Sequence, residues 1–115
     1  MPKIRGTWDR DFSHAHERMK VAVESLVSTG SMEDRLGNAL HTMFHFLHED
    51  EFPEELRMDY QSIISECSTV TPNGNESALD ATIRHMSPQK KKEIAARIVN
   101  LYDSIARDYC TPESL

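Results

Sequence analysis

Residues 8–47, WDRDFSHAHERMKVAVESLVSTGSMEDRLGNALHTMFHFL, decide the fold. In the first half of this stretch, apolar residues recur at spacings of three and four, the period of one helix face. A second run begins directly after Gly30, a residue that tolerates the left-handed conformation at helix ends. Two amphipathic helices joined by so short a hinge predict an antiparallel hairpin. The recurring positions are Trp8, Phe12, Ala15, Met19, Ala22 and Leu26, widened by Val23 and Val27, and then Leu36, Leu40, Met43 and Leu47.

Local signals set the expected helix boundaries. The first helix is expected over about residues 8–28 with Thr7 as its N-cap, and the second from Ser31 to about Glu49. Ser31 and Asp34 have the spacing of a capping box. Phe52-Pro53 predicts a third helix, because the residue before a proline avoids the helical region and proline suits the first helical position. Its expected buried face consists of Leu56, Tyr60, Ile63, Ile64 and Cys67.

The remainder of the chain predicts a long connection, a short helix and a final long helix. Residues 68–77, STVTPNGNES, form a turn-rich loop that is expected to be mobile or functional. A short helix is expected over residues 78–86, and Ser87-Pro88 starts the last helix, which runs to about Tyr109. The expected architecture is all-α: one domain over residues 1–115, built as a bundle of four main helices with a short extra helix before the last. Residues 1–6 and 110–115 are expected to be flexible.

Composition narrows the expected partners. The hydrophobic fraction of 38% is low for 115 residues, so the core is thin or a second surface completes it, which predicts a homodimer. The formal net charge of −6 disfavours nucleic acid and anionic membranes as ligands. A protein partner is therefore expected, and a basic surface would suit it best.

The expected location is the cytoplasm. The first six residues, MPKIRG, lack the apolar region of a secretory signal, and no apolar run reaches the ~18 residues of a membrane span. Cys67 and Cys110 are too few and too far apart to form a disulfide framework. Both thiols are therefore expected to be reduced, with Cys67 in the core.

Three histidines mark the second helix. His41, His45 and His48 share one stripe at 100° per residue, together with Asp34, and the stripe lies well away from the apolar face. Imidazoles at this spacing with a carboxylate can hold zinc, so these four residues are the candidate metal ligands. Two other interpretations stay open: a solvated or interface surface that happens to be rich in histidine, and a pH-sensitive interface.

A second pattern overlaps the histidine stripe. Arg35 and His41 form an R-x5-H pair, which resembles the R-x4–6-H motif of HEPN ribonucleases, small all-helical dimers that cleave RNA at the subunit interface. The resemblance implies Arg35 and His41 as catalytic residues of a metal-independent ribonuclease. The family usually has a polar residue directly after the arginine, and Leu36 stands there in this chain. The acidic balance also opposes an RNA-binding enzyme.

Two smaller features call for an explanation. Lys90-Lys91-Lys92 places cations near a helix start, where they oppose the helix dipole, so an anion or acidic partner could bind them. A solvated turn is the plainer interpretation.

Gly37 inside a helix costs about 1 kcal/mol against alanine, so it is expected to mark the close approach of another backbone.

The preferred functional interpretation is non-enzymatic. No nucleophile elbow or phosphate-binding glycine loop is present, so no catalytic residue, cofactor or metal is assigned. We expect a small acidic protein-interaction module that acts as an adaptor, regulator or inhibitor of another protein, plausibly of bacterial or phage origin. The alternatives are the HEPN-like ribonuclease and a zinc-binding protein centred on the histidines.

Overall fold

The computed structural model describes residues 12–108, and these residues form helices and connections with no strand. The all-α prediction is confirmed, including the short helix before the last. Thr7, Trp8, Tyr109 and Cys110 lie outside the described residues, as do both segments expected to be flexible. The elements are α1 (Ser13–Leu26), α2 (Met32–Phe46), the 3-10 helix η2 (Glu49–Glu51), α3 (Glu54–Glu66), α4 (Ala78–His85) and α5 (Pro88–Asp108).

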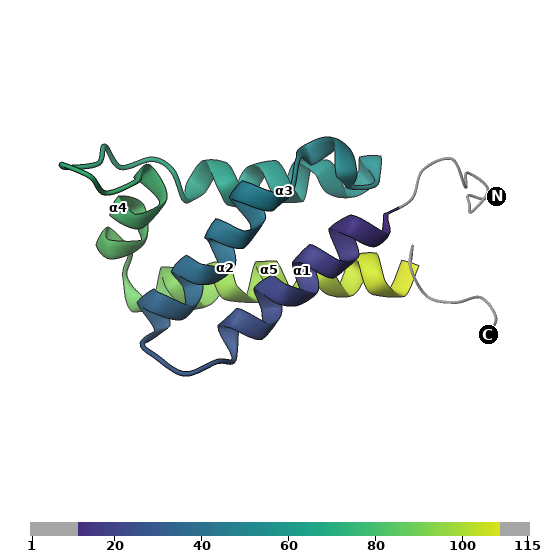
Figure 1. The fold of residues 1–115 in the computed structure, drawn as a ribbon, viewed down its shortest axis with the longest axis horizontal. Coiled ribbons are helices and arrows are strands. Elements are labelled where there is room, and N and C mark those ends of the chain that lie inside the picture. Colours follow the sequence, from purple (N-terminus) through teal and green to yellow (C-terminus); the bar gives the residue numbers. More distant parts are fainter. Residues whose placement is uncertain (1–11, 109–115) are drawn as a thin grey trace.

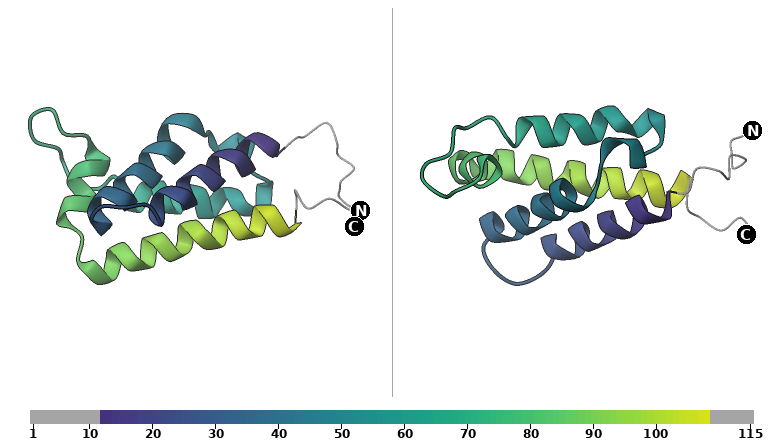
Figure 2. Two further views of the ribbon diagram at one scale, coloured as in Figure 1. Left: turned by 60° about the horizontal axis from the view of Figure 1, so that its bottom comes forward. Right: turned by 45° about the horizontal axis from the view of Figure 1, so that its top comes forward.

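The longest helix, α5, forms the spine of the bundle (Figures 1 and 2). Helices α1 and α3 pack against α5, α2 packs mainly on α1, and the short α4 packs against α2. All five α-helices contribute to one hydrophobic core. Its largest fully buried side chains are Phe52, Met19, Leu36, Leu40, Met43, Ile63, Ile83, Ile94, Ile98 and Ile105.

The predicted hairpin of α1 and α2 is present, and Arg35 fixes its turn. Gly30 adopts a φ of 114°, and the Ser31 side chain accepts a hydrogen bond from the Asp34 backbone N–H at 3.0 Å. The Arg35 guanidinium donates to the carbonyl of Leu26 at 2.7 Å and to that of Gly30 at 3.1 Å. The Leu26 carbonyl belongs to the last residue of α1, where helix carbonyls lack an intrahelical partner, so Arg35 caps α1 from the first turn of α2 and also ties down the connection at Gly30.

Helix α1 ends earlier than the sequence predicts. The backbone N–H groups of Val27 and Ser28 bond three residues back, to Glu24 and Ser25, which tightens the chain into a turn after Leu26. Val27 is consequently 77% exposed and does not widen the apolar stripe. At the other end of the helix, Phe12 is half-buried rather than buried.

Helix α2 ends at Phe46, three residues before the predicted end. Residues 47 and 48 are extended, and the acidic residues that follow form the first turn of η2 instead of the C-terminus of α2. That exchange is favourable, because carboxylates are stabilised at a helix N-terminus and destabilised at a C-terminus. His48 is the N-cap of η2: its Nδ1 accepts from the Asp50 N–H at 3.2 Å, and its own N–H donates to the Glu51 carboxylate at 2.9 Å.

A buried tyrosine joins α3 to the end of α2. Phe52 is extended, as predicted, but Pro53 is the N-cap rather than the first helical residue of α3. The Tyr60 hydroxyl lies 3.1 Å from the carbonyl oxygens of both Met43 and Leu47, and its ring packs on Phe52 with centroids 4.6 Å apart. Burial, together with nearby carboxylates of η2, raises the pKa of Tyr60 to about 12.

The long loop 68–77 is held at its base, whereas its tip is exposed. The Val70 N–H donates to the hydroxyl of buried Thr82 at 2.9 Å. Near the other end, the Arg84 guanidinium donates to both carboxylate oxygens of Glu76, at 2.9 and 2.6 Å. Residues 71–75 between these anchors are exposed, and Gly74 has a φ of 59°.

Candidate functional site

A cleft of about 450 Å³ lies where α4 packs against α2, and we call it the α2–α4 cleft. Its lining is mostly polar, and its negative side chains outnumber its positive ones by four to one. The lining residues are Glu33, Asp34, Gly37, Asn38 and His41 from α2, Glu76 from the loop, and Asp80, Ile83 and Arg84 from α4.

Helical spacing explains how these side chains reach one place. Asp34, Asn38 and His41 occupy successive turns of one face of α2, and Asp80 and Arg84 are one turn apart on α4. Between the two helices, Gly37 faces Ile83: a Cβ at Gly37 would lie 3.9 Å from the Ile83 Cδ1, an ordinary contact. The close neighbour of Gly37 is therefore a side chain, and the expected approach of another backbone is wrong.

The cleft carboxylates differ in how well they are neutralised. Glu76 is paired with Arg84, and Asp80 Oδ1 lies 2.9 Å from His41 Nε2. Glu33 lies 3.7 Å from the Lys91 ammonium of α5. The exposed Asp34 carboxylate makes no ion pair within residues 12–108. The cleft therefore keeps an excess of negative charge.

His41 stands between Asp80 and His45 in a chain of contacts. His41 Nδ1 lies 3.2 Å from His45 Nε2, and the two rings are parallel to within 6°. The ring centroids are 5.3 Å apart, which exceeds the nitrogen separation by nearly two ring radii, so the rings lie edge to edge. This geometry allows an N–H···N hydrogen bond, in which one ring nitrogen donates and the other accepts.

The structure alters the predicted histidine stripe. His41 and His45 lie together, and Asp34 lines the same cleft as His41, but His48 has left the helix and caps η2. Asp80 was missed as a partner of His41. Among residues 12–108, no three His, Cys, Asp or Glu side chains are grouped so that they could hold a metal ion. Zinc binding by the predicted four ligands stays an untested prediction.

Arg35 and His41, the residues of the R-x5-H pair, contact different parts of the protein. Arg35 is half-buried and caps α1, whereas His41 contacts α4. A ribonuclease would need both side chains at one substrate phosphate, and in the chain as described Arg35 is engaged by two backbone carbonyls.

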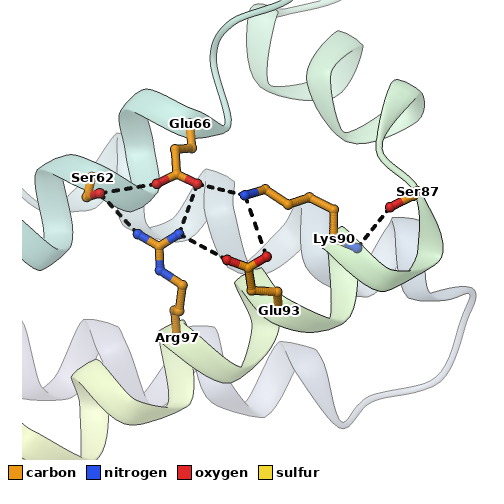
Figure 3. Close-up of polar contacts among 6 residues, drawn as sticks. All are labelled: Ser62, Glu66, Ser87, Lys90, Glu93 and Arg97. Atoms are coloured by element: carbon orange, nitrogen blue, oxygen red, sulfur yellow. Dashed lines mark hydrogen bonds and ion pairs between the residues drawn. The ribbon is translucent and has the colours of Figure 1, made fainter.

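Lys90 and Lys91 form ion pairs within the fold. In Figure 3, Lys90 and Arg97 of α5 converge on Glu66 of α3, with Lys90 Nζ 2.8 Å and Arg97 Nη1 3.0 Å from its Oε1. Lys91 pairs with Glu33, as described above. The Lys90 backbone N–H is capped by the Ser87 hydroxyl at 3.0 Å. The lysines therefore fasten α5 to α3 and α2.

We predict that the Glu66 cluster makes stability depend on acidity. Hydrogen bonds from Arg97 and Lys90 lower the pKa of Glu66 from 4.5 to about 2. A lowered folded-state pKa stabilises the protein above the unfolded value, and that stability is lost as the pH falls from 4.5 to 2. Because the side chain is 39% exposed, solvent screening limits the contribution to about 1 kcal/mol.

Denaturant unfolding of the wild type and of Glu66→Gln tests this prediction. The free-energy difference between them should be about 1 kcal/mol at pH 5 and should shrink towards pH 2.5. Glu17→Gln, at an exposed position of α1, serves as the matched control and should show no such trend. A difference that stays constant across this range would contradict the assignment.

The remaining features add no reactive group. Cys67 is fully buried, as predicted, and burial raises its pKa to about 12, so its thiol stays protonated. None of the helices described is both long and apolar enough to cross a membrane.

The cleft was only partly predictable. The sequence pointed to Asp34 and His41 and predicted a short helix over residues 78–86, but it singled out neither Asp80 nor Arg84. The position of α4 against α2 has no signal in the sequence, so the meeting of these groups was missed.

Comparison of the chain with protein-family models, curated proteins and solved structures found no match.

Proposed function

We propose that this protein is a non-enzymatic interaction module whose α2–α4 cleft binds a basic side chain, arginine or lysine, from a segment of another protein. The observation that carries the proposal is the convergence of four carboxylates on one cleft of about 450 Å³. In this role the protein would act as a cytoplasmic adaptor, regulator or inhibitor.

The geometry of the cleft suits a long cationic side chain. Gly37 and Ile83 provide an apolar floor for an alkyl stem, and Asp34 supplies a carboxylate for the charged head. Long basic side chains combine these two properties. The overall charge of −6 adds attraction at longer range.

Phe44 extends the candidate surface beyond the cleft. It is 50% exposed, and its ring contacts that of His45 edge to face, with centroids 5.3 Å apart. Aromatic residues at exposed positions supply apolar contact area at protein interfaces. A bound segment could therefore place a basic residue in the cleft and an apolar residue on Phe44. The expected homodimer remains a separate proposal.

The test is titration of the ¹⁵N-labelled protein with the capped peptide acetyl-Ala-Arg-Ala-Arg-Ala amide, followed by NMR. The backbone signals that shift should belong to the first half of α2 and to α4. The same peptide with glutamine in place of arginine should bind at least fivefold more weakly. Asp34→Asn should weaken arginine-peptide binding about threefold to fivefold, which corresponds to about 1 kcal/mol for one unscreened surface charge.

Asp59→Asn is the matched control, because Asp59 is an exposed aspartate of α3 outside the cleft. It should leave the affinity unchanged. Equal affinity for the two peptides, or equal effects of both substitutions, would refute the cleft as the binding site. Stoichiometric zinc in the purified protein, or metal-independent RNA cleavage lost in His41→Gln, would replace the proposal with one of the two alternatives.

A further inference from the structure

The tip of the 68–77 loop carries Asn73-Gly74, the only Asn-Gly pair in the sequence. Figure 1 shows the loop projecting past α4 at one end of the bundle. Both residues of the pair are exposed, and Gly74 adopts a φ of 59°, which glycine accepts without strain. The two anchors of the loop lie outside the pair, at Val70 and Glu76. The pair is therefore open to solvent.

The backbone nitrogen of Gly74 is placed to act as a nucleophile. Its N–H donates to no backbone carbonyl among residues 12–108, and a Cβ built at Gly74 would have no neighbour within 4 Å. Glycine also lacks a side chain that would shield this nitrogen. The nearest electrophile along the chain is Cγ of the Asn73 side chain, because a bond between the two atoms closes a five-membered ring.

We infer that Asn73 is a site of spontaneous deamidation. The Gly74 nitrogen loses its proton to solvent and attacks Asn73 Cγ. The new N–C bond closes a succinimide ring, and the side-chain nitrogen leaves as ammonia. One water molecule then opens the ring at either carbonyl, which leaves aspartate or isoaspartate at position 73. The net reaction consumes one water, releases one ammonia, and needs no oxidant or reductant.

The other three asparagines of the chain provide an internal comparison. Asn38 and Asn100 are exposed, but each lies inside a helix, where the next backbone N–H donates to the carbonyl four residues back. Ring closure there must break this bond and distort the helix. Asn75 lies in the same loop as Asn73, but its neighbour Glu76 carries a side chain. The Glu76 N–H is also bonded to the Asn73 carbonyl at 3.2 Å.

The reaction changes the loop that carries Glu76, which lines the α2–α4 cleft. Either product adds one negative charge. Isoaspartate also routes the main chain through the former side chain, which lengthens the turn closed by the Asn73–Glu76 hydrogen bond. Glu76 has a separate anchor in Arg84, and none of residues 68–77 belongs to the hydrophobic core. The modified chain should therefore keep its fold, and the inference does not depend on the proposed function.

The experiment is incubation of the purified full chain at pH 8 and 37 °C, followed by peptide mapping that separates asparagine, aspartate and isoaspartate. Asn73 should convert at least tenfold faster than each of the other three asparagines. A synthetic peptide of residues 70–78 is the unfolded reference, and the folded chain should convert within fivefold of its rate, because the fold does not protect the loop tip. Ion exchange should show the added negative charge.

Two variants test the chemistry, and a third is the matched control. Gly74→Ala puts a methyl group beside the attacking nitrogen and should slow conversion at least tenfold. Asn73→Gln, which does not alter Gly74, should abolish the added charge. Asn75→Gln should convert at the wild-type rate. Conversion at Asn73 that is no faster than at Asn75, that is unchanged in Gly74→Ala, or that is more than fivefold slower than in the peptide overturns the inference.

Discussion

Phe52→Ala should lower the free energy of unfolding by about 3–5 kcal/mol, the usual cost of removing a buried phenylalanine ring. Phe52 is fully buried and packs on Tyr60, at the junction of η2 and α3. Truncation would leave a cavity between the end of α2 and the start of α3. Domains of this size are commonly stable by only about 5–15 kcal/mol, so the variant should lose a large part of its stability.

Denaturant unfolding followed by circular dichroism measures this loss. Phe52→Leu should lose less stability than Phe52→Ala, because leucine keeps most of the buried volume. This variant also keeps the comparison measurable if Phe52→Ala does not fold. Met58→Ala, at a residue of α3 that is 76% exposed, should change stability by less than about 0.5 kcal/mol. A loss below 1 kcal/mol in Phe52→Ala would show that Phe52 does not lie in the core.

Tyr60→Phe should cost about 1–3 kcal/mol although it removes only one oxygen atom. The single proton of the hydroxyl is shared between two carbonyl groups at the end of α2, those of Met43 and Leu47. The Met43 carbonyl also accepts from the Leu47 N–H, so the loss of the hydroxyl mainly leaves the carbonyl of Leu47 without this donor. The matched control is Tyr102→Phe on α5, where the ring is half-buried and stacks on His16. That substitution should be neutral within about 0.5 kcal/mol.

Alkaline unfolding adds a test with a definite sign. The folded-state pKa of Tyr60 is raised from 10 to about 12, so its stabilising contribution is complete below pH 10 and is lost between pH 10 and 12. The wild type should therefore lose stability relative to Tyr60→Phe over that interval. A constant difference between the two proteins would place the Tyr60 hydroxyl in solvent.

The fold was largely predictable because the apolar periodicity reports which face of each helix is buried. Leu26, Leu40 and Ile63 are in the core where their spacing placed them. Helix ends were predicted less well, because competing local hydrogen bonds decide them. The helical spacing of residues in α2 continues through His48. The helix nevertheless ends at Phe46, because residues 47 and 48 are extended and His48 caps η2 instead.

The candidate site shows the limit of one-dimensional periodicity. A helical period assigns His41 and His45 to one stripe, and their contact follows from it. The contact of His41 with Asp80 joins residues 39 positions apart and depends on how α4 crosses α2. Arg35 shows the same limit. Its place in the sequence indicates a surface cation, but its guanidinium caps α1 because α1 and α2 lie side by side.

The exposed tip of the 68–77 loop has a consequence for the connectivity of the chain. Each end of the loop has its own anchor, Thr82 for Val70 and Arg84 for Glu76, and the link across Gly74 adds one turn hydrogen bond, from the Glu76 N–H to the Asn73 carbonyl at 3.2 Å. A chain cut at this tip would yield one piece with α1 to α3 and another with α4 and α5. The first piece holds thirteen of the nineteen buried core residues and the second holds six, and the packing of α5 on α1 and α3 and of α4 on α2 joins the two pieces. The link at Gly74 thus acts as a tether that raises the effective concentration of two complementary pieces.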